Sequence, residues 1–256
     1  MCAQPVSDTP DRPGRQRISP LQWVGLAVLV LLVANQMGLL RLTSPGSINQ
    51  FLVRELPRFV ALVLAITVHE FSHGFVATQF GDTTPRRFGR LTLNPLKHLD
   101  PLGTLMILVG PIGWGKPMPI DPREMRNGNL GWALSSIAGP VSNVIAALLA
   151  ATLYGLLPGL GPTPTAFFLV FILINVLLAV FNLIPLPPLD GFGFLYGLAP
   201  RPIKVALVPL HSIGPLLLLA LLFLPPLRPI VDGFINTGTE LIFPLLEGAC
   251  QCILPV

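Results

Sequence analysis

The chain has 256 residues, of which 52% are hydrophobic and 11% are charged. Soluble globular domains contain about 25% charged residues. The composition, with a mean hydropathy of +0.72, therefore excludes a soluble enzyme, a disordered chain and a nucleic-acid binder. A net charge of +4 is small and indicates no nucleic-acid partner.

The N-terminal part predicts a polar tail followed by membrane helices. Residues 1–20 are polar and contain several arginines, which indicates a cytoplasmic tail. Residues 21–40 are twenty uncharged, mostly apolar residues, long enough to span the hydrocarbon core and longer than the apolar part of a signal peptide. Residues 59–80 form a second span, which contains two histidines and a glutamate.

The middle of the chain contains a segment that is too short to span. Residues 102–115 are apolar but are interrupted by glycines and a proline, which predicts a re-entrant segment. Residues 130–157 form a third span.

The run from residue 166 to residue 199 is too long for one straight span. As a single helix it would measure roughly 51 Å, against a hydrocarbon core of about 30 Å. Pro185, Pro187 and Pro188 interrupt it, so we expect the helix to break near Asp190. Residues 205–224 form the last clear span, and residues 228–256 form either an interfacial helix or a weak further span.

These elements together predict an all-α polytopic membrane protein in the lipid bilayer. We expect about five to six transmembrane helices, a re-entrant loop and a Pro-broken helix. The predicted division comprises a cytoplasmic tail, a first helix with an outer loop, a catalytic membrane core and C-terminal segments, at 1–20, 21–58, 59–198 and 199–256. With the N-terminus in the cytoplasm, the inside loops hold twelve of the sixteen Lys and Arg residues, which favours that orientation.

Two carboxylates lie at membrane depth, Glu70 and Asp190. An ionisable group there costs roughly 2.5–3.5 kcal/mol even on lenient scales, which indicates a function. His69, Glu70 and His73 form an HExxH motif. On a helix, positions i and i+4 share a face, so both imidazoles can reach one metal ion and Glu70 can take a proton from its water. Two packed histidines with a stray carboxylate are the structural alternative.

The motif supplies two protein ligands, whereas a catalytic zinc site usually has three plus water. Glutamate is common as the third ligand. Asp190 is the other carboxylate at depth, and the prolines before it allow the backbone to turn inward. A helix-break cap beside Gly191 is the structural alternative for Asp190.

These two motifs resemble those of the site-2 protease family of intramembrane zinc metalloproteases, peptidase family M50. His69, Glu70 and His73 match the family's first motif. The segment from Asn182 to Gly191, with Pro185 and Asp190 inside it, matches the second in loose form. The match covers roughly residues 59–198 and indicates a minimal form without PDZ or CBS domains.

The resemblance implies an intramembrane zinc metalloendopeptidase that cleaves in or near transmembrane segments of other membrane proteins. One zinc ion per chain would be held by His69, His73 and Asp190, with Glu70 as general base. Asn182 would hold the substrate or stabilise the oxyanion. The expected location is a prokaryotic cell (inner) membrane.

Three further residues are candidate substrate contacts. Gly113 and Gly115 resemble the GxG signature of the family's re-entrant loop, where free backbone groups could pair with an extended substrate; a simple connecting loop is the alternative. Asn143 lies in a span, where it contacts the substrate, the backbone of the zinc helix, or a neighbouring helix by a plain hydrogen bond.

A membrane transporter or a metal-dependent scaffold is the rival class. Neither requires a carboxylate next to a metal ligand, so the sequence favours the protease.

Overall fold

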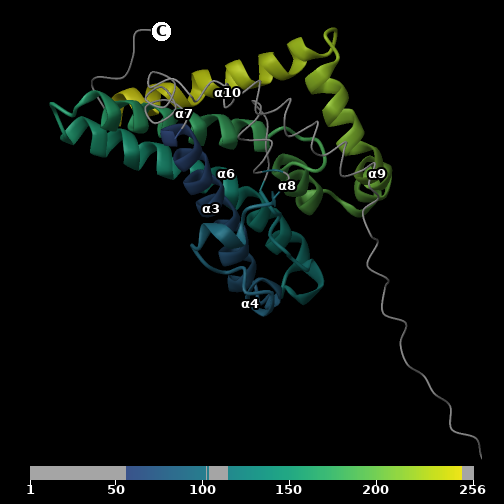
Figure 1. Ribbon diagram of the computed structural model, residues 1–256. Coiled ribbons are helices and arrows are strands. Elements are labelled where there is room, and N and C mark those ends of the chain that lie inside the picture. The colour runs from purple at the N-terminus through teal and green to yellow at the C-terminus, as the bar shows by residue number, and fades with distance from the viewer. Residues whose placement is uncertain (1–55, 102, 104–114, 250–256) are drawn as a thin grey trace, which may run out of the picture.

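The structure is a computed structural model that describes residues 56–101, 103 and 115–249. The described part is helical (Figure 1). Its long helices are α3 (Leu56–Gln79), α6 (Gly128–Leu156), α7 (Pro162–Asn182), α9 (Arg201–Phe223) and α10 (Arg228–Ala249). Short helices are α4 (Thr84–Arg87), α8 (Asp190–Leu198), and the 3-10 turns η3 (Pro95–Lys97) and η4 (Pro122–Glu124).

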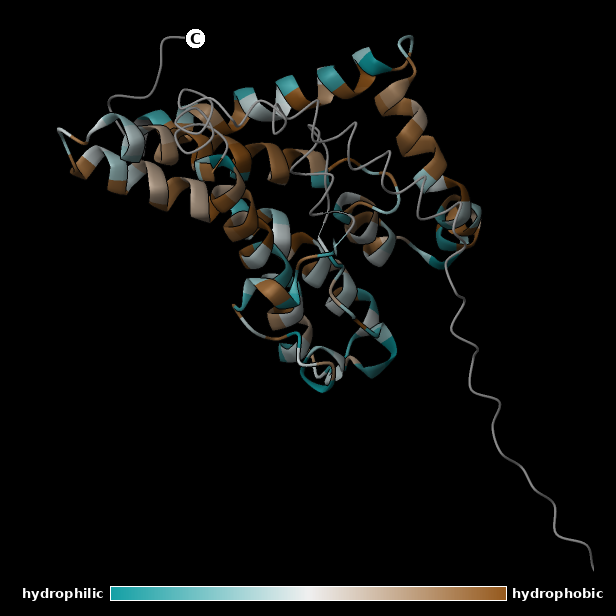
Figure 2. Cartoon of the chain, in the orientation of Figure 1, coloured by the Kyte–Doolittle hydropathy of each residue, from teal (hydrophilic) through white to brown (hydrophobic). Residues whose placement is uncertain are grey.

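Four of these helices are long and apolar enough to cross a membrane: α3, α6, α7 and α9. They match the predicted spans closely, and Figure 2 shows them largely in the hydrophobic colour. The first expected span, residues 21–40, and most of the expected re-entrant segment lie outside the described residues. The helix α10 is not among the four candidate spans, and Figure 2 shows polar and apolar residues mixed along it. The predicted division of the chain stays a prediction.

Helix α6 is central, because it contacts α3, α7, α8 and α10. Small residues allow this close approach: Ala65 in α3, Ala133 and Ala147 in α6, and Ala179 in α7 are each fully buried. Membrane helices commonly associate through such small residues, which let backbones come together. The helix α3, which carries the HExxH motif, is thereby held against the middle of α6.

The predicted break of the long apolar run is confirmed. Helix α7 begins at Pro162, whose ring favours a first helical position, and ends at Asn182. The chain then turns through the proline-rich segment 183–189 before α8 begins at Asp190. Prolines lack the N–H that a continuing helix needs, which explains the interruption. The break places Asp190 at the first turn of a new helix.

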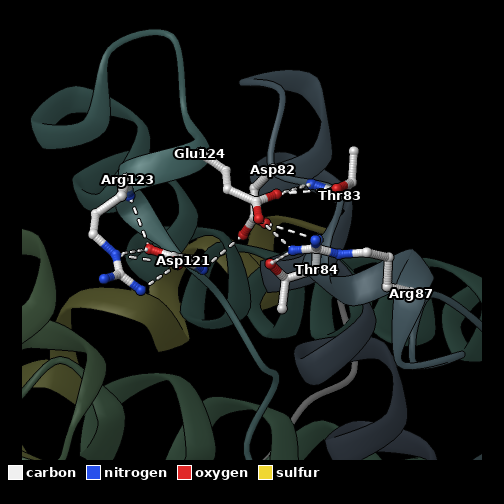
Figure 3. A network of polar contacts seen from close by, with 7 residues as sticks. All are labelled: Asp82, Thr83, Thr84, Arg87, Asp121, Arg123 and Glu124. Atoms are coloured by element: carbon white, nitrogen blue, oxygen red, sulfur yellow. Dashed lines mark hydrogen bonds and ion pairs between the residues drawn. The ribbon is translucent and has the colours of Figure 1, made fainter. Parts of the chain in front are cut away.

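A polar cluster joins the two loops at one end of the molecule (Figure 3). Asp82 is fully buried and accepts hydrogen bonds from the backbone N–H groups of Thr84 and Asp121, each at 2.8 Å. Arg87 pairs with Glu124 across the same junction. The hydrogen bonds from Arg123 hold the pKa of the Asp121 carboxyl down at about 2. These contacts fix the loop after α3 against the loop before α6.

Candidate metal centre

The side chains of His69, His73 and Asp190 meet between α3 and α8. The two Nε2 atoms of the histidines are 3.0 Å apart. Asp190 Oδ2 lies 3.1 Å from His69 Nε2 and 3.3 Å from His73 Nε2. Both histidines are buried and Asp190 is largely so. The structure therefore brings together all three predicted ligands, from sequence positions more than a hundred residues apart.

The hydrogen bonds of the two imidazoles fix which nitrogen faces this centre. His69 Nδ1 lies 2.6 Å from Asn143 Oδ1, and His73 Nδ1 lies 2.7 Å from the carbonyl oxygen of Ser135. Both partners are oxygens that only accept, so each Nδ1 carries the hydrogen and donates it. Each Nε2 of a neutral ring then presents a lone pair to the centre. Two lone pairs and a carboxylate oxygen face one point.

This arrangement fits a metal ion. The ligand atoms of a tetrahedral site, each about 2.0–2.1 Å from zinc, are roughly 3.3 Å from one another, close to the spacings observed here. The buried Asp190 Oδ2 has no hydrogen-bond partner among the described residues. A buried acceptor without a partner is costly unless a cation compensates it. Two histidines and a carboxylate are also a known donor set of catalytic zinc sites.

Gly139 of α6 makes room for the centre. A Cβ atom at this position would lie 2.4 Å from His73 Nε2 and 2.6 Å from His69 Cε1. Real Cβ contacts do not occur at such distances, so only glycine lets α6 approach the two imidazoles. Sequence reasoning did not select Gly139, although its position just before Pro140 inside a span was a possible signal.

Asn143 is fully buried and orients His69. Its Oδ1 accepts from the His69 ring, while its Nδ2 donates to the Ala65 carbonyl at 3.3 Å and to Asn175 Oδ1 at 2.8 Å. Contact with the zinc-helix backbone and an interhelical hydrogen bond, two of the expected alternatives, are both present. Its substrate contact, the third alternative, stays a prediction.

Asn175 of α7 is a residue that sequence reasoning missed. It is fully buried, accepts from Asn143, and donates from Nδ2 to the Phe171 carbonyl at 2.8 Å. Its signal in the sequence was an amide flanked on both sides by apolar residues in the middle of a span. Such outer hydrogen bonds orient metal-ligating histidines and fix their tautomers.

Three predicted site residues remain, Asn182, Gly113 and Gly115. Asn182 ends α7, and its Nδ2 donates to the Leu178 carbonyl at 2.9 Å, so its oxyanion role stays a prediction. Gly113 lies outside the described residues. Gly115 lies beside Glu70, because a Cβ at Gly115 would be 4.0 Å from Glu70 Oε1. The structure thus places one of the two predicted glycines near the predicted base.

The chain is similar to several bacterial proteins. Putative zinc metalloprotease YwhC of Bacillus subtilis (strain 168) is 38% identical over 203 residues, which cover 76% of this chain and 93% of the relative. Putative zinc metalloprotease Rip2 of Mycolicibacterium smegmatis (strain ATCC 700084 / mc(2)155) is 34% identical over 178 residues, 65% of this chain and 66% of the relative. The Rip2 protein of Mycobacterium tuberculosis (strain ATCC 25618 / H37Rv) is 32% identical over 213 residues, 75% of this chain and 80% of the relative.

No protein-family model matches the chain, and no solved structure matches it significantly. The similarity to YwhC nevertheless extends over nearly all of that relative, and the metal-binding group of His69, His73 and Asp190 agrees with the activity in its name. The chain therefore belongs to the site-2 protease family of zinc metalloproteases, peptidase family M50.

Proposed function

We propose that this protein hydrolyses peptide bonds in or near the transmembrane segments of other membrane proteins. The observation that carries the proposal is the convergence of His69, His73 and Asp190 on helices α3 and α8, with Glu70 directly after the first ligand. Because α3 is long and apolar enough to cross a membrane, the centre it carries would act within the bilayer.

The proposed cofactor is one zinc ion per chain, held by His69, His73 and Asp190. A zinc ion bound there would supply Lewis-acid chemistry and lower the pKa of a water ligand to about 7. Glu70 would accept the proton of the attacking water and deliver it to the leaving amine. Asn182 would donate a hydrogen bond to the developing oxyanion, provided that its amide turns away from the Leu178 carbonyl.

The substrate would be bound as an extended segment rather than as a helix. A helix hides its peptide groups in its own hydrogen bonds, so the segment to be cut must unwind first. Gly113 and Gly115 would present backbone groups for pairing with it, as in β-augmentation. The position of Gly115 beside Glu70 supports this part of the proposal.

The proposed location is a bacterial cell (inner) membrane, with the N-terminus in the cytoplasm. The four candidate spans and the bacterial source of the relatives support the membrane assignment. In this orientation the loops between α3 and α6 face the cytoplasm, and most of the basic residues lie on that side. The partners are lipids and transmembrane substrates.

The experiment is an assay of the purified, zinc-loaded protein on a model transmembrane substrate, with and without a zinc chelator. Cleavage should occur, stop with the chelator, and return when zinc is restored. A transporter or scaffold would give no cleavage on any of several substrates. Cleavage that persists in the presence of the chelator would contradict the metal-dependent mechanism.

Glu70→Gln separates chemistry from binding in the same assay. The amide keeps the shape of the side chain but cannot accept the proton, so cleavage should fall by about 10²–10⁴-fold or below detection. Zinc and substrate should both remain bound, because the residue is not a ligand. A cleavage rate within about tenfold of the wild-type rate is a smaller loss than removal of a general base causes. That result would show that Glu70 is not the general base.

A further inference from the structure

Two buried side chains outside both family motifs hold the backbone next to Glu70. Arg90 is 5% exposed and His98 is fully buried, although both lie in the loop after α3. Burial lowers the pKa of the Arg90 guanidinium. Charged and polar loop residues are rarely this buried without a specific contact.

The contacts of Arg90 and His98 form a closed circuit of four hydrogen bonds. Arg90 Nη2 donates to the Lys116 carbonyl at 2.6 Å, and Lys116 N–H donates to the His98 carbonyl at 2.7 Å. His98 Nε2 donates to the Thr92 carbonyl at 2.7 Å, and Thr92 N–H returns to the Arg90 carbonyl at 2.9 Å. Both backbone groups of Lys116 are therefore bound on the same side.

This circuit leaves the backbone groups of Gly115 on the opposite side. Leu99 and Gly115 form an antiparallel bridge in which Lys116 faces the 98–99 segment. In an extended strand the N–H and C=O groups of successive residues point to opposite sides. Neither backbone group of Gly115 has a hydrogen-bond partner among the described residues. Pro117 is the next residue whose backbone faces the same side as that of Gly115, and it has no N–H to donate. Hydrogen-bonded pairing with a substrate that begins at Gly115 therefore ends at Pro117.

The absence of a side chain at Gly115 brings this edge onto α3. A Cβ would lie 2.6 Å from Ile66 Cγ2, 3.2 Å from the His98 carbonyl oxygen and 4.0 Å from Glu70 Oε1. Glycine therefore permits this bridged segment to lie against α3 at the level of the HExxH motif. Gly115, whose backbone groups are unpaired within the described part of the chain, therefore lies next to the carboxylate of Glu70.

We propose that Arg90 and His98 are positioning residues for substrate. Arg90 binds the Lys116 carbonyl and His98 binds the Thr92 carbonyl, and together they hold Gly115 beside Glu70 as the edge that pairs with the unwound substrate. The proposal rests on the proposed function, since it assigns residues to substrate binding at that site. Neither side chain touches the metal ligands in the described contacts, so zinc binding does not depend on them.

The kinetic test compares Arg90→Met and His98→Leu with wild type. Each variant removes one hydrogen bond of the circuit while keeping the side-chain volume, so KM for a transmembrane substrate should rise about tenfold, with little change in kcat. Zinc content should equal that of wild type. His98→Gln restores a donor to Thr92 and should recover most of the binding. Arg86→Met, at an exposed arginine of α4 four residues earlier in the chain, is the matched control.

If Arg90 and His98 only stabilised the loop, KM for the substrate would not follow the hydrogen bonds that these variants remove or restore. Unchanged KM in both variants, or a KM as high in His98→Gln as in His98→Leu, would overturn the proposal while leaving the protease function intact. A wild-type protein that neither binds nor cuts the substrate would instead contradict the function on which the proposal rests.

Cross-linking tests the pairing at Gly115, on which the proposal depends, without altering Arg90 or His98. Lys116→Cys is introduced into a Glu70→Gln chain whose three native cysteines are replaced by Ser, and single cysteines are scanned along the substrate. Pairing on the Gly115 edge predicts disulfides at alternate substrate residues, because strand side chains repeat every two positions. A repeat of three to four residues, which indicates a docked helix, would overturn the proposal, as would no cross-link at any position.

Discussion

The imidazole of His69 is held by amide groups from two other helices. His69 in α3 donates to Asn143 in α6, which donates to Asn175 in α7, which in turn donates to a carbonyl of its own helix. The carbonyl acceptors at the end of the series determine the orientation of both amides. Asn143 thus fixes the tautomer of His69, and Asn175 supports Asn143 without touching His69. The lone pair of Nε2 is directed to the metal centre as a result.

Asn175→Leu should weaken metal binding without removing a ligand. The substitution removes the shorter of the two hydrogen bonds that Asn143 Nδ2 donates and leaves only the one to the Ala65 carbonyl. Loss of outer-shell partners of metal ligands typically costs about 10–100-fold in affinity. Competition with a calibrated chelator measures the change. Asn236→Leu, at an exposed position of α10, is the control. An affinity unchanged from wild type would show that Asn143 holds His69 unaided.

The break between α7 and α8 places the third ligand, Asp190, beside the two histidines. The start of α8 packs directly on the end of α7, since a Cβ at Gly191 would lie 2.1 Å from the Leu183 carbonyl oxygen. Pro187 is also in contact with α9, because a Cβ at Gly214 would lie 2.6 Å from its side chain. The turn is therefore packed from both sides, and Asp190 has little freedom to move away from the histidines.

Gly191→Ala should displace Asp190 while leaving every ligand present. The added methyl group cannot occupy space 2.1 Å from a backbone oxygen, so α8 must shift. We expect a lower zinc content and lower cleavage, with helical content retained by circular dichroism. Gly233→Ala in α10, where a Cβ meets nothing within 4 Å, is the matched control. Full zinc content in Gly191→Ala would mean that Asp190 is not a ligand.

At the scale of the whole molecule, one end is polar and basic. The loops between α3 and α6 hold the buried Asp82 junction of Figure 3, and Figure 2 shows polar residues gathered around α4 at that end. The opposite ends of α6 and α7 meet in a short connection with no charged residue. This asymmetry is typical of a protein whose basic loops stay in the cytoplasm.

The orientation is tested by labelling single cysteines in a chain whose native cysteines are replaced by Ser. Lys97→Cys, in the loop after α3, should react with an impermeant thiol reagent only after the membrane is opened. Thr163→Cys, at the start of α7, should react in intact cells. Both positions are exposed in the structure. The reverse pattern would invert the proposed topology.

Much of the site could be predicted because its main features depend on residues that are close together in the sequence. The HExxH spacing places two histidines on one helical face, and the prolines before Asp190 mark the break. Asn175, Gly139 and the Arg90–His98 circuit could not be predicted, because they depend on how helices and loops far apart in the sequence pack. Helix α3 is apolar on most sides, so no distinct apolar face in its sequence indicates which residues of α6 and α7 it contacts.

The binding of a catalytic zinc ion by His69, His73 and Asp190 is tested most directly by metal analysis of purified protein. Wild type should carry about one zinc per chain, and His73→Ala and Asp190→Ala should each carry much less, because each loses one of three protein ligands. Asp232→Ala, at an exposed carboxylate of α10, should match wild type. Full zinc occupancy in Asp190→Ala, or a zinc-supplied wild type that retains none, would contradict zinc binding by these three residues.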